Sequence, residues 1–259
     1  MSEQQPVVLE KRPDGIAIVK IVRPVALNAL NLATRKALAE AFAGLQDDPE
    51  VRCIVLTGDE KAFAAGADLK ELADADAVEI MKRRTERYWQ TVARTPQPII
   101  AAIQGFALGG GLELAMICDI VVAGENAQLG QPEVRVGIIP GAGGTQRLTR
   151  AVGKFQAMRL CLTGRPISGR EAYEIGLASL AVPDGEVMET ALKMAEGIAK
   201  LPPLAVASVK EAILHGENAS LESGLALERK AFQLLFATQD RREGMAAFIE
   251  KRKPKFPGS

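Results

Sequence analysis

The sequence predicts an α/β fold followed by a helical C-terminal region. Ile16 to Val22 and Val51 to Thr57 are dense in β-branched residues, which is typical of buried strands. A helical pattern lies between these two runs, and a strand, a helix and a second strand in succession indicate a crossover connection in an α/β sheet. From Leu204 to Arg252 the residues favour helix and form no clear strand pattern.

The first helix is predicted between the two strands. Asn31 or Thr34, or a close neighbour, would cap its start, and Asp47-Asp48-Pro49 would end it. Its apolar residues recur at helical spacing, namely Leu32, Leu38, Phe42 and Leu45.

Further units of this kind follow along the chain. The expected elements are a loop at 58–66, a polar helix at 69–94, a buried strand at 99–103, a short helix from the glycines at 109–111 to residue 116, a strand at 120–123, a helix start at 131–133 and helix after residue 144. Pro202-Pro203 then interrupts the pattern. We therefore expect a core with the active site over residues 1–199 and a helical segment over residues 200–259.

The composition is that of an ordinary globular protein, with 47% hydrophobic and 25% charged residues among 259. Basic and acidic residues balance at 32 each, so no overall field attracts nucleic acid or anionic lipid. Polar residues and glycines interrupt the apolar stretch Pro98 to Gly124, which excludes a membrane span. Met1 to Gly15, with Glu3, Glu10 and Asp14, lacks the apolar region of a signal peptide.

Several catalytic chemistries are excluded by the residues present. His215 is the single histidine, stands just before a glycine and is expected to complement a helix C-terminus. A histidine-based triad or a histidine metal site is therefore not expected. Cys53, Cys118 and Cys161 are widely spaced, which favours reduced, buried thiols in a cytoplasmic protein and no metal site. Neither a dinucleotide-binding nor a P-loop glycine motif occurs, and no cofactor is expected.

Two glycine-rich turns offer backbone N–H groups instead. Ala64 to Asp68 and Leu108 to Gly111 each follow apolar sequence and precede a helix, where free N–H groups and the helix dipole favour negative charge. Two such turns facing one another could hold a carbonyl oxygen as its charge develops. Close packing and tight turning are the structural alternative for each turn.

Two glutamates lie in unusually apolar settings. Glu113 comes two residues after the glycine turn, in the first turn of an otherwise apolar helix, and Glu133 stands at a helix start before Val134 and Val136. Burying a carboxylate is costly unless partners satisfy it. Charge complementation at a helix start explains either residue alone. Together with two donor loops, the pair indicates acid–base chemistry on a water molecule.

Basic residues cluster in two segments despite the overall balance. Residues 82–94 carry a net charge of +4 and residues 240–255 carry +3. Such clusters are usually solvated surfaces, but the second could bind a phosphorylated ligand.

The chain resembles enoyl-CoA hydratases of the crotonase superfamily in segments that run in family order across nearly its whole length. These are RPVALNAL from Arg23, KAFAAGADLKEL from Lys61, PIIAAIQGFALGGGLELAMICDIVVAGENAQLGQPE from Pro98, GIIPGAGGTQRLTRAVGK from Gly137 and DRREGMAAFIEKRK from Asp240. The resemblance implies a spiral of ββα units with strands in two roughly perpendicular sheets, a C-terminal helical segment that builds homotrimers, and pairing of trimers into hexamers.

The resemblance also implies roles for individual residues. The amides of Ala67 and Gly110 would bind the thioester carbonyl, Glu113 would orient and deprotonate water, and Glu133 would protonate the α-carbon. Water would thus add across a trans-2,3 double bond to give a 3-hydroxyacyl-CoA. Residues implied in CoA binding are Ala26, Ala64, Asp68, Leu69 and Lys70, with Phe248 and Lys251 on the same or a neighbouring subunit.

This chain departs from the family pattern in two places. Val25 stands where many hydratases have Lys or Arg, which removes the basis for a phosphate contact there, and Leu112 stands where Cys is common. The acyl pocket would be lined by residues 71–94 and by the C-terminal helices, and short straight-chain substrates of fatty-acid β-oxidation are the default expectation.

Other functions remain open at this level, because one fold supports several reactions. A Δ3,Δ2-enoyl-CoA isomerase is the main alternative, although it typically needs a single base. A 2,3-dehydroadipyl-CoA hydratase is another, since the chain also resembles that group. A noncatalytic CoA-binding or RNA-binding member is disfavoured by the zero net charge and the two glutamates.

Overall fold

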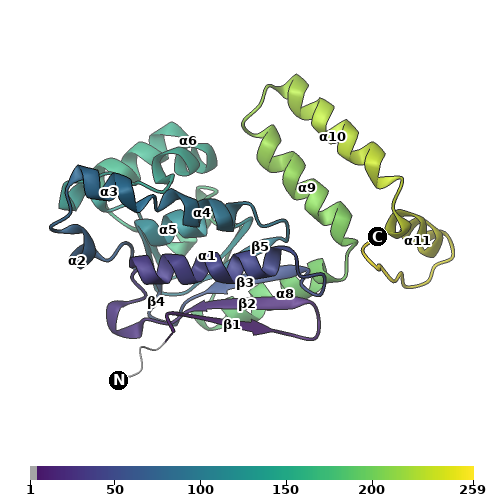
Figure 1. The fold of residues 1–259 in the computed structure, drawn as a ribbon, viewed down its shortest axis with the longest axis horizontal. Coiled ribbons are helices and arrows are strands. Elements are labelled where there is room, and N and C mark those ends of the chain that lie inside the picture. The colour runs from purple at the N-terminus through teal and green to yellow at the C-terminus, as the bar shows by residue number, and fades with distance from the viewer. Residues whose placement is uncertain (1–4) are drawn as a thin grey trace.

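Two β-sheets organise residues 5–259, the part of the chain that the computed structural model describes (Figure 1). Glu3 of the acidic N-terminus therefore lies outside the described residues. The larger sheet has the strand order β1-β2-β3-β5-β7-β10 and the smaller one β4-β6-β8-β9. Pairing is parallel except between β1 and β2 and between β8 and β9.

The bounds of the elements are as follows. The strands are β1 (Val7–Lys11), β2 (Ile16–Ile21), β3 (Cys53–Thr57), β4 (Ala62–Ala64), β5 (Ile99–Ile103), β6 (Phe106–Leu108), β7 (Ile120–Gly124), β8 (Gln128–Gly130), β9 (Ile167–Ser168) and β10 (Leu180–Val182). The helices are η1 (Pro24–Ala26), α1 (Leu32–Gln46), α2 (Leu69–Leu72), α3 (Ala77–Arg83), α4 (Glu86–Ala93), α5 (Gly110–Ala115), η2 (Glu133–Val136), α6 (Gly144–Thr163), α7 (Gly169–Glu174), η3 (Asp184–Glu186), α8 (Val187–Ala199), α9 (Pro203–Gly216), α10 (Leu221–Leu235) and α11 (Gln239–Ile249).

Successive strands alternate between the two sheets. β3 belongs to the larger sheet, β4 to the smaller one, and α2 follows; β5, β6 and α5 repeat this order, and so do β7, β8 and η2. The predicted α/β fold with a spiral of ββα units is confirmed. Each turn of the spiral brings the end of a small-sheet strand to the start of a helix, where backbone N–H groups are free.

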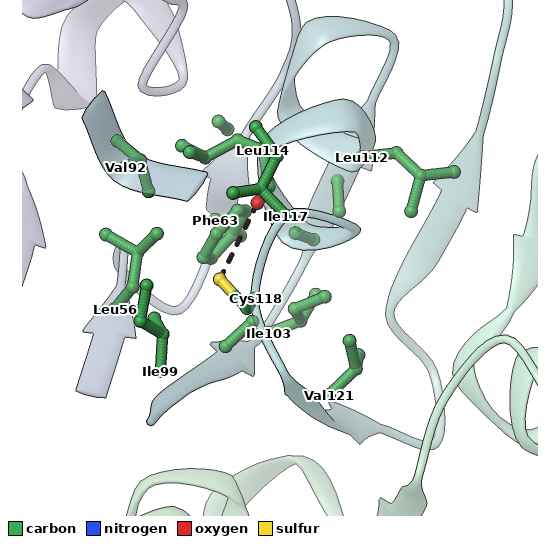
Figure 2. Packing of buried hydrophobic residues seen from close by; sticks show 14 of the residues in the cluster. Leu56, Phe63, Val92, Ile99, Ile103, Leu112, Leu114, Ile117, Cys118 and Val121 are labelled. Carbon is green, nitrogen blue, oxygen red and sulfur yellow. Dashed lines mark hydrogen bonds between the residues drawn. The ribbon is translucent and has the colours of Figure 1, made fainter. Parts of the chain in front are cut away.

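The larger sheet is buried on both faces, because alternate residues of its strands point to opposite sides. One face packs against α8 through one cluster of apolar residues, namely Ile16, Cys53, Val55, Ile100, Val122, Val187, Ala191 and Ala195. The other face joins the main core with α1, α4 and α5. Figure 2 shows part of that core, where Phe63, Leu114 and Ile103 meet and the Cys118 thiol donates to the Leu114 carbonyl oxygen at 3.6 Å.

Helix α1 begins and ends where the sequence predicts. The Asn31 side chain accepts a hydrogen bond from the Thr34 backbone N–H at 2.9 Å, and Asp47 follows the last helical residue. Asn31 is therefore the N-cap. His215 lies in the last turn of α9, as predicted. The thiols of Cys53, Cys118 and Cys161 are free, and the first two are buried.

The predicted polar helix at 69–94 is wrong as a single element. Asp68 and Asp76 cap new helices by accepting backbone N–H bonds, and Arg84 adopts a left-handed conformation with φ 46° after α3. These local caps compete with continuation of the helix and divide the segment into α2, α3 and α4.

Three further expectations need correction. The loop at 58–66 contains strand β4, and the helix start at 131–133 leads into the short 3-10 helix η2. Helix α6 is interrupted at Gly153, which has φ 75° and ψ 166°. Strands β6, β8, β9 and β10 were missed because they have two or three residues each, too few to show an alternating pattern.

Helices α9, α10 and α11 form an arm that projects from the two-sheet body (Figure 1). The predicted all-helical character of this region is confirmed, and the predicted boundary near residue 200 falls in the turn before α9. Lys210 on α9 ties the arm to the body, because its Nζ lies 2.7 Å from Asp119 Oδ2 and donates to the Gln97 carbonyl oxygen at 2.9 Å. No helix in the described part of the chain is long and apolar enough to cross a membrane.

Candidate active site

The first glycine turn presents the backbone amide of Ala67. Hydrogen bonds to the segment before α1 hold this turn, with the Leu30 N–H donating to the Gly66 carbonyl oxygen at 2.7 Å and the Ala65 N–H donating to that of Leu27 at 3.0 Å. Gly66 has φ 114°, a conformation that side chains rarely adopt. Gly66 therefore suits the backbone conformation of this turn, which directly precedes the Ala67 N–H group.

The second glycine turn presents the amide of Gly110, the first residue of α5. Gly111 packs directly on β4, since a Cβ atom there would lie 1.9 Å from the Ala64 carbonyl oxygen. A Cβ atom on Gly110 would lie 3.6 Å from the Ala67 nitrogen, so the two turns face each other. Within residues 5–259, neither amide donates a hydrogen bond to a protein acceptor. Two unused N–H donors thus converge at one place.

Glu113 lies one helical turn beyond Gly110 and is buried, with 3% of its surface exposed. Its Oε1 accepts hydrogen bonds from the backbone N–H groups of Ala142 at 2.7 Å and Gly144 at 2.8 Å. Burial raises the pKa of this carboxyl above its usual value, while the two N–H groups and the charges of Arg147 and Arg35 oppose the shift. The carboxylate is therefore oriented by protein donors in an apolar surrounding.

Glu133 approaches the same place from η2. A Cβ atom on Gly109 would lie 2.9 Å from Glu133 Oε1, which puts this carboxyl beside the Gly110 turn. The Gln131 amide, with its nitrogen oriented toward Glu133, donates to Oε1 at 2.9 Å and to Oε2 at 3.1 Å. Desolvation raises the pKa of Glu133 to about 7, and the negative charge of Glu113 acts in the same direction.

The two carboxyl groups differ in what they can do. Burial raises the pKa of both groups, but Glu113 accepts two backbone hydrogen bonds that oppose this shift, whereas the pKa of Glu133 is raised to about 7. Such a pair, beside two free N–H groups, can remove a proton at one point and deliver one at another while a neighbouring oxygen gains charge.

The residues implied in CoA binding on the body lie around the first glycine turn. Ala26 is in η1, Ala64 ends β4, Asp68 caps α2, and Leu69 and Lys70 begin α2. Asp68 also pairs with Arg23, whose Nη2 lies 3.1 Å from Asp68 Oδ2. The structure therefore brings these five residues together beside Ala67.

Phe248 and Lys251 are not brought to that place within one chain. Phe248 lies on α11, Lys251 follows it, and Figure 1 shows α11 and α2 at opposite ends of the molecule. Phe248 is 87% exposed and has no role in the core of its own chain. The idea that these two residues act on a neighbouring subunit stays a prediction.

The residues that orient the two glutamates were not predicted from the sequence. Ala142 and Gly144 hold Glu113, Arg147 donates to the Ala142 carbonyl oxygen at 2.8 Å, and Gln131 contacts Glu133. The glycine-rich turn at 141–144 before α6 is a detectable signal, because it offers free N–H groups at a helix start, as the other two turns do. In the described residues, no cluster of three potential metal ligands occurs.

Comparison with known proteins places the chain in a family. The family model described as Enoyl-CoA hydratase/isomerase matches residues 11–259. A probable enoyl-CoA hydratase of Rhizobium meliloti is 48% identical over 241 residues, covering 93% of this chain and 94% of that protein. The 2,3-dehydroadipyl-CoA hydratase of Escherichia coli is 42% identical over 247 residues, covering 95% and 97%. A crystal structure of enoyl-CoA hydratase from Bacillus anthracis has a TM-score of 0.95 at 41% identity, covering 98% of this chain and 100% of that one. By sequence and by fold, over nearly its whole length, the chain belongs to the enoyl-CoA hydratase/isomerase family of enzymes.

Proposed function

We propose that the protein is an enoyl-CoA hydratase, which adds water across the trans-2,3 double bond of an enoyl-CoA to give a 3-hydroxyacyl-CoA. The observation that carries this proposal is that the turns of Ala67 and Gly110 face each other beside two glutamates, of which Glu113 is oriented by two backbone donors and Glu133 has a pKa raised to about 7. Family membership and the hydratases among its relatives support the same reaction class.

In the proposed reaction the thioester oxygen accepts hydrogen bonds from the amides of Ala67 and Gly110. Glu113 takes a proton from water as the water oxygen forms a bond to C3, and the electron pair of the double bond moves toward the thioester. The two amides stabilise the negative charge that develops on the oxygen. Glu133 then gives its proton to C2, which completes the addition.

The CoA moiety is proposed to lie along Ala26, Ala64, Asp68, Leu69 and Lys70. Phe248 and Lys251 would complete the nucleotide site from a neighbouring subunit of a homotrimer or of a hexamer of two trimers. The exposed apolar residues of α9 and α10 support assembly, for example Ile213 at 64%, Phe232 at 61% and Leu234 at 73% exposure. We place the protein in the cytoplasm, with CoA entering as part of the substrate and no separate cofactor.

Two other reactions are kept as candidates. A Δ3,Δ2-enoyl-CoA isomerase would need one base, so two positioned glutamates favour hydration over it. A 2,3-dehydroadipyl-CoA hydratase performs the same chemistry on a carboxylated chain, and the relative of that name in Escherichia coli supports it. A protein that binds CoA without catalysis would have no use for the buried Glu113.

The test is to mix the protein with crotonyl-CoA and follow loss of the absorbance of the conjugated thioester. Glu113→Ala and Glu133→Ala are measured beside the native protein. We expect rapid loss that disappears in both variants. Conversion of a 3-enoyl-CoA without hydration of any 2-enoyl-CoA would instead identify an isomerase, and no conversion of either would contradict an enzymatic role.

A further inference from the structure

Arg35 is an arginine of α1 that points inward without a protein partner. Its Nε is buried and finds no hydrogen-bond acceptor. Its guanidinium carbon lies 5.7 Å from the centre of the Trp89 ring on α4. In the described part of the chain, no carboxylate forms an ion pair with it, so its charge is met by other carboxylates only at longer range.

The other half-buried arginines of the body all reach acceptors. Arg23 pairs with Asp68, Arg52 donates to the Phe256 carbonyl oxygen at 2.8 Å, and Arg147 donates to that of Ala142 at 2.8 Å. This is the usual outcome, because a partly buried charge without a partner is costly. Arg35 is the exception among these four. A partly buried charge that stays unpaired near an active site suggests that a ligand pairs with it.

The charged groups that face Arg35 are already engaged. Glu71 on α2 accepts a hydrogen bond from the Leu32 backbone N–H at 2.9 Å, and Glu113 is held by Ala142 and Gly144. Arg83 on α3 donates to the Glu71 carbonyl oxygen at 2.9 Å and adds positive charge. Desolvation lowers the pKa of Arg35, but an arginine stays protonated. The region between α1 and the segment α2–α4 therefore holds a cation with unused donor capacity.

The position of this cation relative to Glu113 matters for the substrate. The chain just before α1 lies beside both glycine turns, because the Leu30 N–H donates to the Gly66 carbonyl oxygen at 2.7 Å and Leu30 Cδ1 would lie 3.9 Å from a Cβ atom on Gly110. Arg35 is in the first turn of α1, its charge acts on Glu113, and α2–α4 is the segment expected to line the acyl pocket. An acyl chain whose double bond lies at Glu113 can extend toward α2–α4 and so toward Arg35. Trp89 stacks against the guanidinium and limits its motion.

We propose that Arg35 determines substrate specificity by binding a carboxylate at the far end of the acyl chain, so that the protein hydrates enoyl-CoA thioesters that end in a carboxylate. This inference rests on the proposed hydratase function and names its substrate class. A guanidinium is suited to this role because its planar donors match the two oxygens of a carboxylate. A terminal methyl group would leave the buried cation without a partner.

The experiment compares two six-carbon trans-2,3-enoyl-CoA substrates that differ at the chain end, one with a methyl group and one with a carboxylate. We expect the native protein to have a kcat/KM at least about tenfold higher for the carboxylated substrate, as for a site built around a polar partner. Arg35→Met should lower kcat/KM for that substrate by about tenfold to a hundredfold more than for the methyl-ended substrate, mainly through KM. Arg35→Lys should recover part of the loss.

Lys36→Met is the matched control, because Lys36 is the next residue of α1, is exposed and pairs with Glu40 at 3.6 Å on the solvent side. This variant should leave kcat/KM unchanged for both substrates. Competitive inhibition of the native protein by the saturated six-carbon acyl-CoA with a carboxylate or a methyl end supplies a measurement that does not depend on any variant folding. We expect the carboxylated compound to inhibit at least about tenfold more strongly.

Three outcomes would overturn the proposal. If the native protein prefers the methyl-ended substrate, or inhibition shows no preference, Arg35 does not bind a carboxylate. If Arg35→Met lowers kcat/KM equally for both substrates and shifts both pH profiles alike, Arg35 acts on Glu113 instead of binding a carboxylate. In both cases hydration of crotonyl-CoA would leave the hydratase function standing, whereas loss of hydration with every enoyl-CoA would overturn the function as well.

Discussion

The body and the arm of this protein use their apolar residues in opposite ways. In the body, alternate residues of the larger sheet fill two clusters, and side chains such as Phe42 and Phe63 are completely buried. In the arm, no residue of α9 or α10, both fully described, is buried, and Phe232 and Leu234 are largely exposed. The body completes its own core, whereas the arm leaves its apolar surface open to another molecule.

The difference separates two parts of the proposed function. The two amides and both glutamates come from the body, so the chemical step should depend on the body alone. Phe248 and Lys251 come from the arm, so the arm should affect CoA binding and assembly. The following predictions test this division.

The largest effect is expected from Glu133→Gln. This change removes the proton donor and keeps the shape, so we expect kcat to fall by about 10⁴-fold with nearly unchanged affinity for CoA thioesters. Steady-state hydration of crotonyl-CoA and binding of a saturated acyl-CoA measure the two quantities. Turnover comparable to that of the native protein would contradict the role of Glu133.

Gly110→Pro should have the next largest effect. Proline suits the first position of a helix, so α5 should still form, but the substitution deletes one N–H donor, a loss of about 3 to 4 kcal/mol in transition-state stabilisation. Hydration would fall by about 10²- to 10³-fold. Gly110→Ala would place a Cβ atom 3.6 Å from the Ala67 nitrogen, so an unchanged thermal unfolding temperature of Gly110→Pro is the control for folding instead.

The pH dependence should follow the two carboxyl groups. Glu133 must be protonated to act as an acid, so kcat should fall about tenfold per pH unit above about pH 7. Glu113 must be ionised to act as a base, and its raised pKa moves the loss of activity on acidification to a higher pH than for an ordinary glutamate. A kcat that is flat from pH 7 to pH 9 would rule out Glu133 as the proton donor in the slow step.

The smallest effect on chemistry is expected from the arm. The double variant Phe232→Asp and Leu234→Asp places charge at two exposed positions of α10 and should dissociate an oligomer, raising KM severalfold with little change in kcat. Lys230→Asp, an exposed change on the same helix, is the control. Mass measurement in solution reports assembly. A large loss of kcat in the dissociated protein would contradict the prediction that the chemical step depends on the body alone.

The fold was predictable to the extent that its elements carry strong periodic or capping signals. The strands at 16–22, 51–57 and 99–103 were predicted from residues alone and are observed to within two residues, and Asn31 was one of the cap residues considered. The breaks after α2 and α3 were not, because aspartate caps within a polar segment are hard to distinguish from surface charge. Short strands such as β9 form through tertiary contacts, which leave no local pattern.

The candidate site shows the same limit. The glycine turns and the apolar setting of Glu113 and Glu133 were visible in the sequence, and the structure brings all four groups together. That Ala142 and Gly144 hold Glu113 depends on contacts between segments about thirty residues apart, as the separations of 29 and 31 show. That Arg35 lacks a partner was not visible either, because the sequence does not show which charged residues meet in space.

Gly111 packs directly on the Ala64 carbonyl oxygen, so the position of the Gly110 N–H group does not depend on the residues that are expected to line the acyl pocket. The distance between the N–H groups of Ala67 and Gly110, which we propose as oxyanion donors, is set by the main chain, because α5 rests on β4 with no side chain between them. Substitutions in α2–α4, where the acyl chain is expected to lie, do not alter that dimension. A library that varies residues 69–93 could therefore change which acyl group is accepted while the thioester remains gripped in the same way, and a library that varies residue 111 should return glycine.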